Sequence, residues 1–138
     1  MVADDDFAAA VDAANRANEA LLAGSSAALR ACFSHGEDIS LYGGFGGHEV
    51  GWAQIGPRLD WVAQSFAGGH CTYEPISRVV GGDVGLAVQF ERGEAQLRGH
   101  GAAQRLNLRV SMVFRREADA WKMVHRHADP LIDKTPPT

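Results

Sequence analysis

The stretch LRVSMVFRREADAWKMVHRHADP, which runs from Leu108 to Pro130, decides the fold of this protein. It contains two runs with a strand-like alternation of residue types, separated by turn-forming residues at Glu117–Asp119. Successive side chains of a β-strand point to opposite faces of the sheet, so the pattern predicts two strands joined by a turn. The second run is expected to place these side chains on one face: Trp121, Met123, His125, His127 and Asp129.

The strand pattern extends back from Leu108 to about residue 71. Long valine-rich or alternating runs predict strands at Cys71–Val80, Val84–Arg92, Gln96–Phe114 and Trp121–Ala128. Turn signals are expected to separate these strands at Gly81–Asp83, Gly93–Glu94 and Glu117–Asp119. Consecutive strands joined by short turns predict an antiparallel meander.

The first half of the chain is predicted to be mostly helical. Helical spacing of apolar residues predicts helices at about 7–22, 27–33 and 52–66, with one short strand at Asp38–Tyr42. The glycine-rich segment Gly43–Gly47 is predicted to be a flexible loop. Helices followed by a meander predict an α+β fold, in which the helices pack on one face of a curved antiparallel sheet.

Length and charge narrow the class of protein. The chain has 138 residues, which fits a single domain over residues 1–138 with a loose C-terminal tail at 130–138. The formal net charge of −4 argues against nucleic acid as a partner, because no broad basic surface can be assembled. The sequence shows no targeting signal and no membrane-spanning apolar run, so we expect a cytoplasmic protein without a membrane partner. Cys32 and Cys71 are expected to be free thiols, with a bridge between them as the alternative.

Several phrases of the sequence resemble the nuclear transport factor 2-like superfamily, and within it the SnoaL-like group. They are Leu21–Gly24 at the end of the first helix, Glu37–Gly43 followed by a glycine-rich loop and Gly51-Trp52, and the ending Leu108–Glu117 with Trp121–His127. The resemblance runs from about Phe7 to Asp129. It implies a cone in which the helices pack on the concave face of the sheet and enclose a cavity. It also implies a homodimer through the outer face of the sheet.

Relatives in this superfamily include ketosteroid isomerases, polyketide cyclases, dehydratases and the association domain of calmodulin-dependent kinases. The resemblance implies that an enzyme of this kind uses an aspartate or a histidine in the cavity as its acid and base. The chain has no match for the aspartate, tyrosine and protonated aspartate of the ketosteroid isomerases, because Tyr42 does not align with the isomerase tyrosine.

The candidate catalytic residues come from the last predicted strand. By analogy with the fold they should face the cavity, with His127 as the acid and base, His125 assisting it and Asp129 orienting it. One alternative is that the histidines are structural. Another is a metal site, with Asp129 or Glu91 as a third ligand, but no second spaced motif supports it. We therefore predict neither a metal nor a cofactor.

The candidate ligand-binding residues are spread over the chain. Tyr42, Trp52 and Trp61 offer aromatic surface for a pocket, and Met123 lies on the face of the two histidines. The resemblance favours Arg109 and Ser111 toward the cavity, where Arg109 would bind a carboxylate ligand or pair with Glu91.

The function predicted from the sequence is binding of a small apolar organic molecule in the cavity. If the protein is an enzyme, we expect isomerisation, cyclisation or dehydration by proton transfer without a cofactor. The alternative is a non-catalytic module that binds a ligand or assembles with a partner, with Arg109 as the recognition residue.

Overall fold

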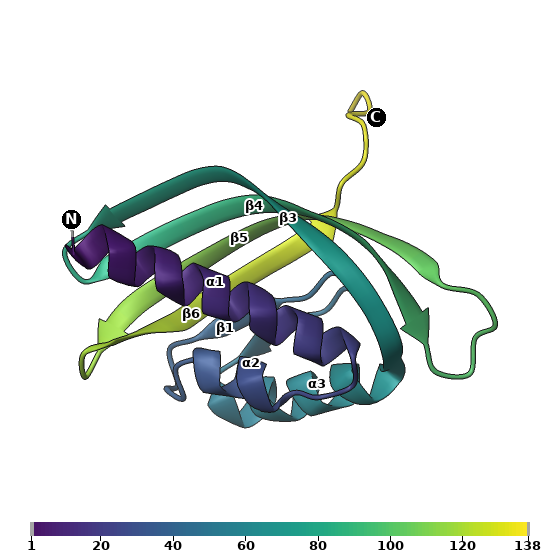
Figure 1. The fold of residues 1–138 in the computed structure, drawn as a ribbon, viewed down its shortest axis with the longest axis horizontal. Helices are drawn as coiled ribbons and strands as arrows, with labels where there is room; N and C mark the ends of the chain where they lie inside the picture. Colours follow the sequence, from purple (N-terminus) through teal and green to yellow (C-terminus); the bar gives the residue numbers. More distant parts are fainter. Residues whose placement is uncertain (1, 138) are drawn as a thin grey trace.

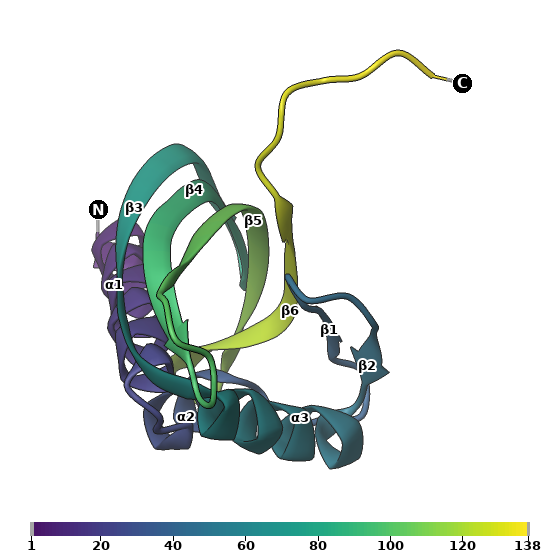
Figure 2. The ribbon, with the colours of Figure 1, turned by 90° about the vertical axis from the view of Figure 1, so that its right-hand side faces the viewer.

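The computed structural model describes residues 2–137, and a curved sheet with three helices on its concave side makes up the fold (Figure 1). The elements are α1 (Val2–Leu22), α2 (Ala27–Cys32), β1 (Ser40–Tyr42), β2 (Glu49–Val50), α3 (Trp52–Ser65), β3 (Phe66–Gly81), β4 (Val84–Leu97), β5 (Gln104–Glu117) and β6 (Ala120–Pro130). The predicted α+β class and the cone with helices on the concave face are confirmed. Residues 131–137 extend away from the sheet (Figure 2).

The sheet has the strand order β2-β1-β6-β5-β4-β3. The long strands β3 to β6 form the predicted antiparallel meander. The sheet as a whole is mixed, because β1 pairs in parallel with β6, with Tyr42 opposite His127. This pairing places the glycine-rich loop after β1 next to the end of β6.

The turn predicted at Gly93–Glu94 is wrong, since β4 continues through it to Leu97. Gly93 lies opposite Cys71 in the ladder, and a Cβ atom added to it would lie 2.2 Å from the carbonyl oxygen of His70. Glycine at this position therefore permits a close approach of two strands rather than a turn. The turn predicted at Glu117–Asp119 is confirmed, with Ala118 and Asp119 at φ of 46° and 67° between β5 and β6.

A β-bulge in β6 changes which side chains face inward. The ladder pairs Phe114 with Met123 but Val113 with His125, so Val124 is an extra residue in β6. Trp121 and Met123 point into the core before the bulge, and Arg126 and Ala128 line the interior after it. The expectation that Met123, His125 and His127 share one face is therefore wrong.

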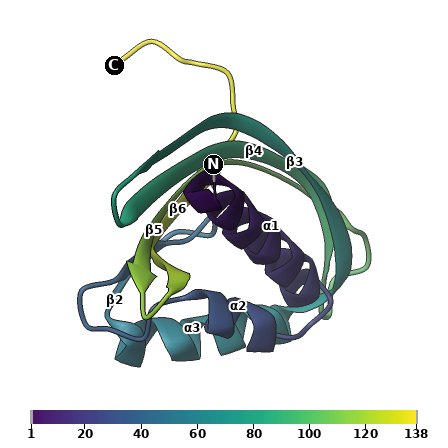
Figure 3. The ribbon, with the colours of Figure 1, turned by 60° about the vertical axis from the view of Figure 1, so that its left-hand side comes forward.

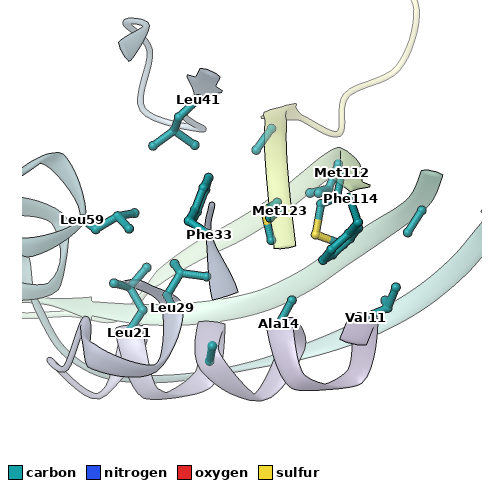
Figure 4. Close-up of a cluster of buried hydrophobic side chains, with 14 of the residues drawn as sticks. Val11, Ala14, Leu21, Leu29, Phe33, Leu41, Leu59, Met112, Phe114 and Met123 are labelled. Atoms are coloured by element: carbon teal, nitrogen blue, oxygen red, sulfur yellow. The ribbon is translucent and has the colours of Figure 1, made fainter. Parts of the chain in front are cut away.

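The core lies between the three helices and the concave face of the sheet (Figures 3 and 4). The helix α1 crosses this face and buries Phe7, Val11 and Leu21 against it. The ring of Phe7 meets Phe114 and Trp121 edge-on, with centroid distances of 5.4 and 5.3 Å. Among the described helices, none is both long and apolar enough to cross a membrane.

Candidate functional site

A cavity lies inside the cone, between the helices, the glycine-rich loop, β1 and strands β3 to β6. The volume of this cavity is about 80 Å³. Most of its lining is apolar and comes from every layer of the fold: Leu21, Leu22, Leu29, Phe33, Leu41, Phe45, Leu59, Val62, Phe66, Leu106, Leu108 and Ala128. Concave apolar sites with a few polar groups are typical of small-molecule binding.

The inner polar end of the cavity is an ion pair between Glu91 of β4 and Arg126 of β6. Arg126 Nη2 donates to Glu91 Oε1 at 2.9 Å, and Nη1 donates to Oε2 at 3.2 Å. The two side chains are 2% and 13% exposed. Two parallel hydrogen bonds give the pair a fixed geometry as well as charge attraction.

The protein around the pair keeps both groups ionised. Burial disfavours the carboxylate of Glu91, but the charge and hydrogen bonds of Arg126 outweigh it, so the pKa of Glu91 lies below its ordinary value. Burial likewise opposes the charge of Arg126, and Glu91 holds the pKa of Arg126 above its ordinary value. Gln89 Nε2 donates to Glu91 Oε2 at 2.8 Å and to Asn15 Oδ1 at 2.9 Å, which ties the pair to α1.

A second polar group lies beside Cys71, which also lines the cavity. Tyr73 and Cys71 share an acceptor, because the Tyr73 hydroxyl and the Cys71 backbone N–H both donate to Glu19 Oε1 at 3.1 Å. Burial raises the pKa of the Cys71 thiol to about 11, and the nearby Glu91 carboxylate adds to the shift. Burial also raises the pKa of Tyr73. Both groups are therefore protonated at neutral pH, and Cys71 is not an activated nucleophile.

The mouth of the cavity is formed by the glycine-rich loop and α3. Phe45, in this loop, lines the cavity and also a surface groove that contains Trp61. Arg58 of α3 holds the loop, since its Nη2 donates to the carbonyl of Gly46 at 3.2 Å. Its Nε lies 3.6 Å from Glu49 Oε1, and its guanidinium lies 4.9 Å from the centre of the Trp61 ring.

The predicted catalytic residues form a separate cluster on the outer face of the sheet. The ring of Tyr42 lies edge-on between those of His125 and His127, at 5.1 and 5.3 Å. His127 Nε2 is 3.6 Å from Asp129 Oδ2, and Ser40 Oγ is 2.6 Å from His125 Nδ1. Tyr42, His127 and Asp129 border an outer cleft on the far side of the glycine-rich loop.

The expectation that His125, His127 and Asp129 face the cavity is wrong, because the bulge at Val124 turns Arg126 and Ala128 inward instead. Burial first, and then the neighbouring His127, lower the pKa of His125. The catalytic roles of this cluster stay predictions.

Arg109 and Ser111 lie on the same outer face. Arg109 does not pair with Glu91; its Nε and Nη2 donate to the two oxygens of Asp129 at 2.7 and 2.9 Å. These hydrogen bonds lower the pKa of Asp129. Leu108 and Val110 of β5 take the inward positions, and Ser111 lies opposite His127 in the ladder. The expectation that Arg109 and Ser111 face the cavity is therefore wrong.

The remaining predicted ligand-binding residues have other surroundings. Met123 is fully buried in the core. Trp52 lies stacked on His35, with a centroid distance of 3.8 Å, and the guanidinium of Arg30 is 5.0 Å from its ring. Trp61 is 58% exposed in the surface groove. In the part of the chain that the structure describes, none of the residues predicted to bind the ligand lines the cavity.

Among the side chains that the structure describes, at residues 6–137, there is neither a metal-binding cluster nor a disulfide. No group of three His, Cys, Asp or Glu residues there is placed to hold a metal ion. Cys32 and Cys71 are both free thiols.

Sequence reasoning missed Arg126, Cys71 and Asn18 as cavity residues, and it considered Glu91 only as a partner for other groups. For Glu91 the sequence offered one signal, a carboxylate within the mostly apolar predicted strand Val84–Arg92. The inward position of Arg126 had none, because it depends on the bulge.

Comparison with known proteins agrees with the architecture. The SnoaL-like domain family matches residues 11–133, which is most of the chain. The chain belongs to the SnoaL-like family. No curated protein matches this SnoaL-like protein by sequence.

Solved structures resemble this SnoaL-like protein over nearly its whole length. A nuclear transport factor 2-like superfamily protein from Salmonella enterica serovar Typhimurium is 18% identical, with a TM-score of 0.83 over 97% of this chain and 94% of that one. A candidate dehydratase of the same family from Streptomyces avermitilis is 19% identical, with a TM-score of 0.80 over 94% and 96%. A candidate association domain of calcium/calmodulin-dependent protein kinase type II from Thiobacillus denitrificans is 23% identical, with a TM-score of 0.74 over 90% and 94%. Likeness at these identities establishes the fold and leaves the activity open.

Proposed function

We propose that this SnoaL-like protein binds a small, largely apolar organic molecule in the cavity of its cone. The observation that carries the proposal is an apolar cavity that ends in the buried Glu91–Arg126 pair. The apolar walls supply the free energy of binding through burial of ligand surface. The ion pair supplies polar groups at one end, which fix the orientation of the ligand.

Ligand binding to a cavity-filled variant tests this proposal. Leu106→Trp puts a larger side chain into the cavity wall, and Leu131→Trp makes the same change at a partly exposed position beyond β6. Binding of acetophenone, a neutral one-ring ketone, is measured by saturation-transfer NMR on both variants and the wild type. We expect Leu106→Trp to abolish binding and Leu131→Trp to retain it. Equal binding by all three proteins would show that the ligand sits elsewhere.

Native mass spectrometry of the freshly purified protein adds an independent test. A retained organic compound that is lost in Leu106→Trp supports the proposal and identifies a chemical class. A retained compound that persists in this variant counts against the cavity as its site.

The second candidate function is the proton-transfer enzyme predicted from the sequence, an isomerase, cyclase or dehydratase without a cofactor. The contact between His127 Nε2 and Asp129 Oδ2, at 3.6 Å beside Tyr42, favours it. Because this contact lies in the outer cleft, away from the cavity, the enzyme is the second candidate. His127→Gln in a folded protein should abolish turnover, and activity that survives this change would exclude the role.

We also propose that two copies of the protein associate through the outer face of the sheet. Such a dimer is compatible with ligand binding in the cavity and with the alternative role as an association module. Apolar side chains gather there, including Ile76, Val79 and Val84, which are 48%, 58% and 51% exposed. An exposed apolar sheet face of this kind is a typical interaction surface.

A further inference from the structure

The charge balance of the cavity wall limits which molecules the cavity accepts. Glu91 and Arg126 are the charged side chains at its inner end, and each is the other's partner through hydrogen bonds of 2.9 and 3.2 Å. The carboxylate is 2% exposed and the guanidinium is 13% exposed, so water screens neither charge well. The pair therefore presents donors and acceptors to the cavity, but no net charge.

The other charged residues of the lining are more exposed to solvent than this pair. Arg58 has Glu49 as its ion-pair partner, at 3.6 Å. His70 is near Glu19 at 3.7 Å, and its side chain is 79% exposed. Glu94 is also exposed to solvent. Among the described residues, no cation without an acidic partner lines the cavity.

An ionic ligand meets two penalties in such a cavity. Its charge loses water on entering an apolar space, which costs several kcal/mol unless a partner compensates it. A carboxylate that approached Arg126 would compete with Glu91 and be repelled by it at close range. A neutral carbonyl or hydroxyl oxygen instead accepts a hydrogen bond from a remaining N–H of Arg126, and the ion pair stays intact.

We propose that the cavity selects uncharged molecules, with an apolar body and one neutral hydrogen-bonding group such as a carbonyl, hydroxyl or amide, and rejects carboxylates of the same shape. This inference rests on the proposed binding function and deepens it. It also separates this protein from a carboxylate receptor, in which an arginine faces the ligand without an acidic partner.

A matched pair of probes tests the selection on the wild-type protein. Benzamide and benzoate have nearly the same size and shape, but only benzoate is charged at pH 7. Dissociation constants from NMR titration should be about tenfold or more lower for benzamide than for benzoate. A tenfold difference corresponds to about 1.4 kcal/mol of binding free energy. Equal or tighter binding of benzoate would overturn the selection and leave the cavity function standing. Failure of both probes to bind would contradict the cavity function itself.

Two glutamate variants then test whether the charge of Glu91 causes the preference for benzamide. Glu91→Gln removes the negative charge of the pair with almost no change of shape, and Glu37→Gln makes the same change at an exposed position that does not line the cavity. We expect Glu91→Gln to reverse the preference, with benzoate gaining about tenfold or more. Glu37→Gln should keep the wild-type preference. If both variants kept it, the inference that Glu91 neutralises the cavity would be wrong. The wild-type comparison does not depend on either variant folding.

Discussion

Arg126 of β6 reaches over β5 to Glu91 of β4 and forms two hydrogen bonds with it, of 2.9 and 3.2 Å. On the way its Nη1 passes 3.7 Å from the sulfur of Met112. Removing one partner leaves the other charge buried and unpaired. Glu91→Ala or Arg126→Ala should therefore lower the free energy of unfolding by about 3–5 kcal/mol. Urea unfolding followed by circular dichroism measures this loss.

A double variant is the control for this first prediction. Glu91→Leu with Arg126→Met removes both charges and fills the space with apolar atoms. Because no charge is left without a partner, we expect the double variant to be more stable than either alanine variant. A double variant as unstable as the sum of the single ones would contradict the role of the charge pair.

The stability of the protein should fall in acid because of Glu91. The pKa of Glu91 is lower in the folded protein than in the unfolded chain, so its contribution is fully present above the unfolded value of about 4.3. It is lost as the pH falls through the folded value, where the carboxylate is protonated. Unfolding free energies measured from pH 7 to pH 3 should show this loss, and the Glu91→Gln variant should show a shallower decline.

His125 should add a separate pH dependence at higher pH. Burial, followed by the neighbouring His127, lowers the pKa of His125 in the folded protein, so protonation favours the unfolded chain. The penalty is absent above the unfolded value of about 6.5 and grows as the pH falls through the folded value. His125→Gln keeps a partner for Ser40 and should flatten the stability curve between about pH 7 and pH 5. An unchanged slope would show that His125 does not titrate with folding.

Gly93 should tolerate no side chain. Alanine there would place its Cβ 2.2 Å from the backbone oxygen of His70, so β3 and β4 would have to separate. We expect Gly93→Ala to lower the free energy of unfolding by about 1–3 kcal/mol or more. Gly81→Ala is the matched control, because no atom lies within 4 Å of its added Cβ. It should change the stability by less than about 0.5 kcal/mol.

The proposed dimer gives a prediction for the outer face. Val88 is a half-buried residue of β4 that alternates with the inward-facing Ala87 and Gln89. A glutamate at Val88 would place an unpaired charge in the interface, so Val88→Glu should be monomeric in light scattering where the wild type is dimeric. Val50→Glu, at the exposed far edge of the sheet, should remain dimeric. A monomeric wild type would exclude the interface.

The spacing of apolar residues predicted most of the helices and strands, because an element that packs on one face repeats its side chains at the period of a helix or a strand. It did not predict which face of β4 is buried, since Gln89 and Glu91 lie inside and Val84 is exposed. Local spacing and turn chemistry alone predict the helices α1 and α3 and the turn at Ala118-Asp119. Gly93 misled the prediction, because a glycine that permits close strand packing has the same local pattern as one that permits a turn.

The interior site was harder to predict, because one residue decides it. Without the bulge at Val124, the inward face of β6 would carry the two histidines, as expected from strict alternation. With the bulge, Arg126 lies inside and His127 outside. The sequence around Val124 contains no glycine or proline that marks an extra residue, so only the pairing of the whole sheet reveals it.

The parallel pairing of β1 with β6 also sets the order in which this domain can assemble. Ser40 and His125 are 85 residues apart in sequence, and β6 lies between β1 and β5 in the sheet. During synthesis, β1 and β2 can pair with each other, but they cannot join the rest of the sheet until β6, the last strand, has been made. Such distant pairing slows folding, and it leaves apolar segments exposed until β6 has been synthesised. The strands β1 and β2 are made first, yet they join the sheet last.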